Sequence, residues 1–358
     1  MRIIAVGDIM PGGLLSITNS EFATKEVRDF LRSGDLRVGN FECAIEIPNP
    51  SGKKYSAGGN TIYIKEKDVF RVRDLGFNVV SIANNHVFDL GPEGAYKVME
   101  VLDKMGIEHC GAGHNLDEAR KPVVVHKDGK SYAFLAFSDT SLKYMYEATA
   151  DSPGVNPLSE ENVTSEIRKA SAQFDYVIVI PHWGVEYTLY PSFQVERLSK
   201  LMVAAGADLI LGGHPHRVQS IVKSKHYCVA YSLGNFLFPN RIINKPRFTW
   251  YPESDGIDFS KLPQVIGKCP PVYEPTIKKW YPCAYSGLIL VCSFEDGCLS
   301  INTKSTLLDE NGCVGFHNKS FFIQRSFLSC LALVIKMDLY WPFYAFFRVI
   351  RKCRSLFK

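Results

Sequence analysis

The sequence contains no Cys-x-x-Cys pair among its ten cysteines, which argues against a zinc knuckle or a dithiol redox site. It also lacks an uninterrupted apolar segment of about 20 residues, the length that a membrane-spanning helix needs. The amino terminus runs directly into a short apolar pattern, residues 1–6, without the long apolar segment and cleavage site of a signal peptide. We therefore expect a cytoplasmic protein with free thiols, because a reducing compartment disfavours disulfides.

A large excess of one charge is absent from most of the chain. Residues 319–358 hold eight of the 41 Lys and Arg residues and one of the 37 Asp and Glu residues, so this tail carries +7 and the remainder carries −3. A mildly acidic body offers no basic surface for nucleic acid, and we expect no nucleic-acid partner.

The tail combines aromatic and basic residues. Its apolar runs, 327–335 and 339–347, are each too short to span a membrane, and joining them would bury charges. A basic aromatic helix of this kind suits the membrane interface, which would place the protein peripherally at the inner face of the membrane. A helical tail packed on the body or on a partner is the equal alternative.

Along the rest of the chain, apolar segments typical of strands alternate with segments that have the apolar period of a helix. Strands are expected at 3–6, 36–38, 79–82, 176–180 and 208–211, helices at 24–32, 65–75, 92–105, 159–172 and 192–205, and hairpins at 123–138, 218–231 and 286–303. This order predicts an α/β fold with a mixed sheet or two stacked sheets. Residues 49–61 are expected to form a polar loop. Within a domain spanning 1–310, residues 239–285 are interpreted as a long insertion or lid.

Five of the predicted strands end in side chains that can bind metal ions. These side chains are Asp8, Glu42, Asn85 with its neighbours Asn84 and His86, His182, and the pair His214 and His216. Each has a simpler explanation alone: an aspartate can cap a turn, an asparagine can hold one, and a lone histidine is usually part of a core. If the strands are parallel, however, their carboxyl ends meet at one edge, where α/β sheets bind ligands.

Taken together, these side chains supply two carboxylates, three imidazoles and a carboxamide. That set matches two neighbouring divalent ions bridged by one carboxylate, about 3.5–4 Å apart. Sites for Mg or Ca would contain more oxygen, so Mn, Zn or Fe is favoured.

Several short motifs also carry a resemblance to a known family. They are Asp8, Asn40-Phe41-Glu42, Ala83-Asn84-Asn85-His86 with Asp89-Leu90-Gly91, His182-Trp183-Gly184 with Glu186, Gly213-His214-Pro215-His216 with Gln219, and Ser232-Leu233-Gly234-Asn235-Phe236. This ordered set resembles the CapA-type capsule synthesis proteins, a family associated with poly-γ-glutamate capsule synthesis and export. The resemblance covers about residues 1–238 and resumes at the last hairpin. It implies the fold of calcineurin-like metallophosphoesterases, an α/β/β/α sandwich around a mixed pair of sheets.

The resemblance also implies roles for individual residues. The implied metal ligands are Asp8, Glu42, Asn85, His182, His214 and His216. His86 would protonate the leaving group, and Asp89 or Glu186 would orient a histidine. Met10 occupies the position of one further histidine ligand, so the first metal site is expected to be one nitrogen short.

Three functions follow as hypotheses. The leading one is a dinuclear-metal hydrolase that acts in the assembly of an anionic surface polymer. The second is a phosphoesterase acting on a small or lipid-linked phosphate. The third is a non-catalytic subunit that binds the polymer or its synthase and export partners, which the substitution at Met10 favours.

Overall fold

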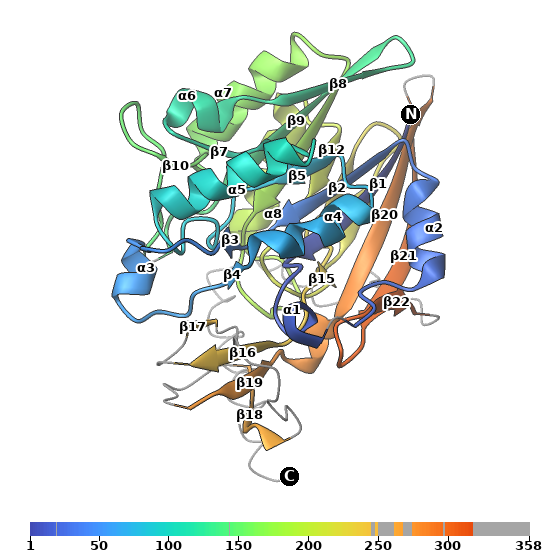
Figure 1. The fold of residues 1–358 in the computed structure, drawn as a ribbon. Coiled ribbons are helices and arrows are strands. Elements are labelled where there is room, and N and C mark those ends of the chain that lie inside the picture. The colour runs from blue at the N-terminus through green and yellow to red at the C-terminus, as the bar shows by residue number, and fades with distance from the viewer. Residues whose placement is uncertain are drawn as a thin grey trace.

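Two β-sheets pack face to face and carry helices on their outer faces (Figure 1). The computed structural model describes residues 1–18, 20–142, 144–244, 248–249, 261–267, 274–295 and 298–317. Within these residues the architecture is the expected α/β/β/α sandwich with mixed sheets. The tail at 319–358, with its predicted helix, lies outside the described residues.

The first sheet has eight strands in the order β22-β21-β20-β1-β2-β5-β6, and β15 also pairs with β1. Its strands are β1 Arg2–Ile9, β2 Leu36–Phe41, β5 Val79–Ser81, β6 Glu108–Cys110, β15 Asn235–Leu237, β20 Ser286–Glu295, β21 Cys298–Leu308 and β22 Val314–Phe316. β1, β2, β5 and β6 are parallel, whereas β20 is antiparallel to β1. The predicted hairpin at 286–303 is confirmed as β20 and β21.

The second sheet has six strands in the order β13-β14-β12-β11-β9-β8. They are β8 Val123–Lys127, β9 Lys130–Ser138, β11 Tyr176–His182, β12 Leu209–Leu211, β13 Ile221–Lys223 and β14 Cys228–Ala230. β9, β11, β12 and β14 are parallel, so β11 and β12 end at the same edge. The expected turn at Asp128 and Gly129 joins β8 to β9, with φ of 55° and 72° at the two residues.

Successive side chains along each strand point to opposite faces of the sheet, and this alternation explains how the layers form. In β1, Ile3 and Ala5 face the second sheet, while Ile4 and Val6 face the outer helices. The outer helices are α2 Lys25–Arg32, α4 Phe70–Asp74 and α5 Pro92–Lys104 on the first sheet, and α7 Glu160–Ser171 and α8 Phe193–Ala205 on the second. The predicted helix at 65–75 is a 3₁₀ turn, η1 Glu66–Val69, followed by α4; the other four match within one residue at either end.

Shorter elements lie in the connections between these strands and helices. They are α1 Leu15–Thr18, β3 Ala44–Ile45, α3 Lys53–Ser56, β4 Tyr63–Ile64, β7 Ala112–Gly113, α6 Leu116–Arg120 and β10 Gly154–Val155. The region expected as a polar loop, 49–61, therefore contains the helix α3. Its four residues are too few to produce a helical period in the sequence.

The described part of 239–285 contains a small separate sheet in the order β17-β16-β19-β18, seen at the lower end of Figure 1. Its elements are β16 Arg241–Asn244, β17 Phe248–Thr249, β18 Gln264–Ile266, β19 Thr276–Lys279 and the 3₁₀ turn η3 Pro282–Tyr285. The ring of Trp280, which follows β19, lies 6.1 Å from that of His216. The insertion thus contacts the strand-end edge where the predicted ligands lie, and its role as a lid stays a prediction.

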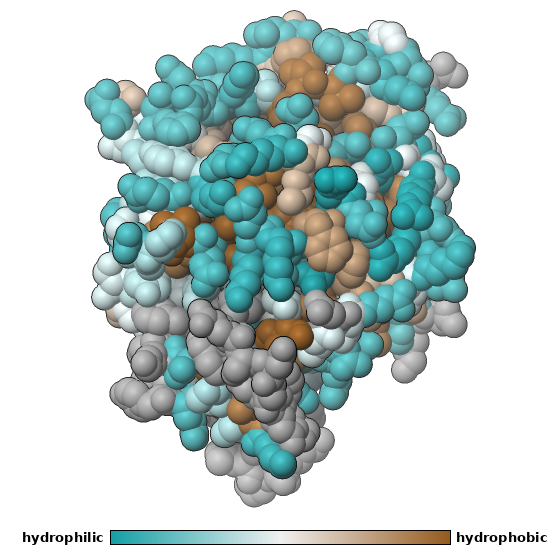
Figure 2. Space-filling model, viewed as in Figure 1, coloured by the Kyte–Doolittle hydropathy of each residue, from teal (hydrophilic) through white to brown (hydrophobic). Residues whose placement is uncertain are grey.

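The surface over α4 and α5 is mainly hydrophilic, with small hydrophobic areas between the helices (Figure 2). In the part of the chain that the structure describes, no helix is both long and apolar enough to cross a membrane. The seven cysteines in that part are all free thiols.

Candidate metal centre

The six predicted metal ligands come together where strands of both sheets end. Asp8 lies in β1, and Glu42 and Asn85 follow β2 and β5, so the first sheet supplies these three. The second sheet supplies the three histidines, because His182 ends β11 while His214 and His216 follow β12. All of them except Asn85, which is partly exposed, are buried. The cluster therefore lies at the seam between the two sheets.

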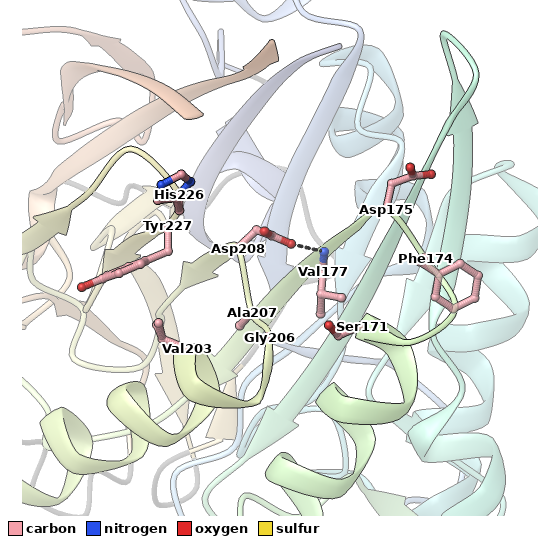
Figure 3. A pocket seen from close by; sticks show the side chains of 10 residues that line it. All are labelled: Ser171, Phe174, Asp175, Val177, Val203, Gly206, Ala207, Asp208, His226 and Tyr227. Carbon is pink, nitrogen blue, oxygen red and sulfur yellow. Dashed lines mark hydrogen bonds between the residues drawn. The ribbon is translucent and has the colours of Figure 1, made fainter. Parts of the chain in front are cut away.

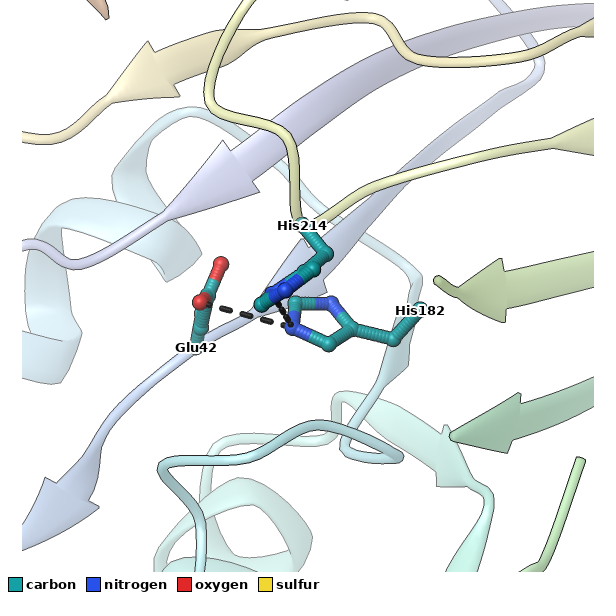
Figure 4. Close-up of side chains that lie close together, drawn as sticks. All are labelled: Glu42, His182 and His214. Atoms are coloured by element: carbon teal, nitrogen blue, oxygen red, sulfur yellow. Dashed lines mark hydrogen bonds and ion pairs between the residues drawn. The ribbon is translucent and has the colours of Figure 1, made fainter. Parts of the chain in front are cut away.

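Two ligand groups share one carboxylate. Asp8, Glu42 and His216 form the first group and Glu42, His182 and His214 form the second, with the ligand atoms of each group within 4.8 Å of one another. Figure 4 shows the second group converging, with His182 Nε2 3.5 Å from Glu42 Oε1 and 3.1 Å from His214 Nδ1. Asn85 joins this group, since its Oδ1 lies 2.8 Å from His182 Nε2.

The cluster fits divalent cations because one buried oxygen lacks a donor. No described residue donates a hydrogen bond to Glu42 Oε1, which lies 3.5 Å from the Nε2 atoms of both His182 and His216. A buried acceptor left in this state costs about 1–3 kcal/mol. Divalent cations held by Glu42 and the facing imidazoles would satisfy that oxygen.

The sequence predicted a deficit at the first of these groups. Met10 is fully buried in the hydrophobic cluster on the outer face of the first sheet. The first group consequently has two carboxylates and one imidazole, whereas the second has one carboxylate, one amide oxygen and two imidazoles.

Burial strongly shifts the protonation of these groups. It raises the pKa of Glu42 well above its usual range and lowers the pKa of His182 and of His214. Burial also opposes charge on His216, but Glu42 and Asp8 outweigh it and raise the pKa of His216 to about 10. Holding a metal ion would therefore require His216 to lose the ring proton that Glu42 and Asp8 stabilise.

The loop after β12 is shaped by close backbone contacts. A Cβ atom on Gly213 would lie 2.5 Å from Asp8 Oδ1, so only glycine lets the loop approach the carboxylate this closely. His214 and His216 adopt φ of 92° and 50°, in the left-handed region that side chains seldom occupy. Such strain is concentrated at functional sites, where the surrounding structure enforces it.

Three asparagines hold the ligands in orientation. Asn40 Nδ2 donates to Asp8 Oδ1 at 2.9 Å, and Asn40 Oδ1 accepts from Asn84 Nδ2 at 3.2 Å. Asn235 Oδ1 lies 2.9 Å from His216 Nδ1 and can accept the proton that this nitrogen carries. The other ring nitrogen, Nε2, then faces Glu42. These residues belong to the motifs that the sequence singled out, but their supporting contacts were not predicted.

The predicted catalytic residues separate into two environments. His86 Nδ1 lies 2.6 Å from Asp89 Oδ2, so Asp89 orients this ring. Burial and then the charge of Lys54 lower the pKa of His86 to about 4, which keeps the ring neutral at pH 7. Glu186 is exposed and, among the described residues, forms no hydrogen bond or ion pair with a histidine, yet its pKa is lowered because the charges of His214, His216 and His86 outweigh the opposing effect of burial. Its catalytic role stays a prediction.

Lys54 is a site residue that the sequence did not reveal. Its ammonium forms an ion pair with Asp89 Oδ1 at 2.5 Å and donates to the backbone oxygen of Asn85 at 2.9 Å. It comes from α3, inside the segment expected to be a polar loop. Nothing in its neighbours' pattern distinguishes it from a solvent-exposed lysine.

A concave region lies at the opposite end of β11 and β12 from the metal-ligand cluster. It is lined by residues such as Asp208, which accepts a hydrogen bond from the Val177 N–H at 2.7 Å (Figure 3). None of the predicted ligands lines it. The metal-ligand cluster and this pocket are thus separate features of the second sheet.

Comparison with known proteins adds evidence independent of this geometry. The chain is 33% identical over 248 residues to the capsule biosynthesis protein CapA of Bacillus anthracis, covering 66% of this chain and 60% of that protein. It is 33% identical over 240 residues to the PGA biosynthesis protein CapA of Bacillus subtilis, covering 65% of this chain and 62% of that one. The chain thus matches less than two thirds of the length of these relatives.

Among solved structures, a hypothetical protein from Thermus thermophilus is 14% identical, with a TM-score of 0.46 over 85% of this chain and 98% of that one. A putative 5′-nucleotidase from Staphylococcus aureus is 13% identical, with a TM-score of 0.45 over 84% of this chain and 52% of that one. The model of the bacterial capsule synthesis protein family, PGA_cap, matches residues 2–240, which is most of the described sandwich. The chain therefore belongs to the bacterial capsule synthesis protein family PGA_cap.

Proposed function

We propose that this protein is a metal-dependent hydrolase that acts on an anionic substrate during the biosynthesis of a capsule or similar surface polymer. One observation carries the proposal: two ligand groups share Glu42, whose buried Oε1 faces two imidazoles and has no hydrogen-bond donor among the described residues. The family assignment supports the biosynthetic context.

The proposal assigns two ions to the cluster. Asp8, Glu42 and His216 would hold the first, and Glu42, Asn85, His182 and His214 would hold the second. Mn, Zn or Fe suits this mixture of oxygen and nitrogen donors. When bound, such ions activate water near neutral pH and stabilise negative charge on a phosphoryl or carbonyl oxygen.

The chain's own residues would handle orientation and proton movement. Asp89 holds the Nδ1 proton of His86, so Nε2 of the neutral ring carries a lone pair and can accept a proton from the nucleophile. This differs from the expectation that His86 protonates the leaving group, because burial and Lys54 disfavour the charged ring at pH 7. Asn40 and Asn235 keep the carboxylate and the imidazole of the first group oriented.

The test combines metal analysis with turnover. The purified protein should contain divalent metal and hydrolyse the model phosphodiester bis(p-nitrophenyl) phosphate when Mn is supplied. Glu42→Gln should lose metal and turnover together, because both ligand groups use this carboxylate, whereas His226→Ala, at an exposed histidine outside the cluster, should retain both. Full turnover in the Glu42→Gln variant would refute the assignment.

The deficit at Met10 supports a second candidate, a non-catalytic subunit that binds the polymer or its synthase. In that case the protein would bind an oligomer of γ-linked glutamate but hold no stoichiometric metal. If the protein is an enzyme, a lipid-linked or small phosphate ester is the alternative substrate. Faster hydrolysis of a phosphate monoester than of a diester or a γ-glutamyl amide would identify that substrate class.

A further inference from the structure

We infer that Lys54 is a positioning residue, which fixes both the ring orientation of His86 and the backbone of the predicted ligand Asn85. This inference rests on the proposed function for its catalytic meaning, but the contacts themselves are independent of it. Lys54 Nζ lies 2.5 Å from Asp89 Oδ1, 2.9 Å from the Asn85 backbone oxygen and 3.3 Å from His86 Nδ1.

The ammonium has three donors, and the contacts assign two of them. Asp89 and the Asn85 carbonyl accept one each, and both are close enough for charge-assisted hydrogen bonds. The third direction faces His86 Nδ1, but that nitrogen is 2.6 Å from Asp89 Oδ2 and donates its own proton there. Lys54 therefore acts through Asp89 and Asn85 rather than on a substrate.

The segment that carries Lys54 is held tightly against the site. A Cβ atom on Gly52 would lie 2.2 Å from the backbone oxygen of Asp89, so the chain can pass there only as glycine. The Lys53 N–H donates to the hydroxyl of Tyr146 at 3.1 Å, and the Tyr146 ring stacks on Phe88. These contacts place α3 beside the His86–Asp89 turn, and the Lys54 side chain is only 14% exposed.

This arrangement joins the proton-handling residue to a metal ligand. Asp89 also accepts a hydrogen bond from the Ile62 N–H at 2.7 Å, so its carboxylate has fixed partners on both oxygens. The Lys54 ammonium thus sets the position of His86 through Asp89, and it sets the position of the Asn85 side-chain amide through the Asn85 backbone. Loss of such a supporting contact at a metal ligand typically weakens metal binding about 10- to 100-fold.

The experiment compares Lys54→Met with Lys53→Met. The control removes the same charge one residue earlier, where the Lys53 ammonium packs over the Tyr146 ring outside the site. Mn affinity is measured by isothermal titration, and the ring nitrogens of His86 are followed by ¹⁵N NMR in metal-free protein. Lys54→Met should weaken Mn binding at least about tenfold and should move the ¹⁵N resonances of the His86 ring from their wild-type positions, because Asp89 loses the partner that fixes its Oδ1. Lys53→Met should change neither.

The two readouts separate this inference from the proposed function. If the wild-type protein binds no Mn, the proposed function fails, while the NMR comparison still tests the role of Lys54. An unchanged His86 spectrum in Lys54→Met would overturn the inference, as would unchanged Mn affinity in a metal-binding protein. If Lys54→Met does not fold, Lys54→Gln is judged by the same two outcomes.

Discussion

Replacing His214 with alanine gives the most direct test of the metal centre. His214 belongs to the ligand group that contains Glu42 and His182, so its loss removes one of two imidazoles from that group. We expect the variant to bind one metal ion fewer than the wild-type protein, because the first group does not use His214. Elemental analysis of the purified proteins measures this difference.

The expected thermal effect follows from linkage. An ion at 100 times its dissociation constant stabilises the folded state by about 2.7 kcal/mol. Unfolding entropy of about 2.1 cal/mol/K per residue over 358 residues converts this to a rise of about 4 °C in melting temperature per ion. If the substitution weakens binding about 100-fold, the same metal concentration contributes only about 0.4 kcal/mol, which corresponds to less than about 1 °C.

The assay is differential scanning fluorimetry with Mn and with a chelator. When the chelator is added, the melting temperature of the wild-type protein should fall by the contributions of both ions. The melting temperature of His214→Ala should fall only by the contribution of the ion in the first group. His226→Ala serves as the control, because its exposed ring lies outside the cluster and its metal response should equal that of the wild type. Full metal content and a wild-type metal-dependent shift in His214→Ala would refute the reasoning.

Three other predictions test separate features. Gly213→Ala should displace the Asp8 carboxylate, since the new Cβ would lie 2.5 Å from its Oδ1, and should reduce occupancy of the first ion in elemental analysis; unaltered occupancy would contradict the close approach. Asp208→Asn should stabilise the protein at pH 7 by roughly 1 kcal/mol in urea unfolding, after allowance for solvent screening, because burial raises the pKa of Asp208 to about 6. In the unfolded chain Asp208 ionises near its usual pKa of 3.8, so the loss of stability caused by the buried aspartate grows as pH rises from there to about 6. If Asp208→Asn still stabilised the protein at pH 3, this cause would be wrong. Deleting residues 326–358 should move the protein from the membrane fraction to the supernatant if the tail lies in the interface, and unchanged membrane recovery would exclude that role.

The strand segments and the residues at their ends were the most predictable part of the structure. Asp8, His182 and His214 were identified because each follows a short apolar run that reads as a buried strand. Parallel pairing then requires residues at the carboxyl ends to share an edge. The sequence could not show that Glu42 would be common to both ligand groups, since that depends on the register between β1 and β2 and on how the two sheets stack.

Residues whose positions depend on irregular segments were not predictable. Lys54 reaches the site because glycine at position 52 lets α3 lie against the backbone of Asp89, which is a contact between distant parts of the chain. The small sheet in 239–285 has strands of two to four residues, which are too short to give an alternating pattern. The neutral state of His86 likewise arises from burial and from Lys54, and neither can be deduced from its motif.

The division of ligands between the two sheets has a consequence for assembly of the fold. Each half of the sandwich contributes an incomplete set of donors, so an ion can be captured only after the halves have docked. Once bound, the ion would link the two halves across their boundary and oppose their separation. Substitutions in the apolar layer between the halves, such as Phe134→Ala, would then appear first as reduced metal loading, even though that side chain is no ligand.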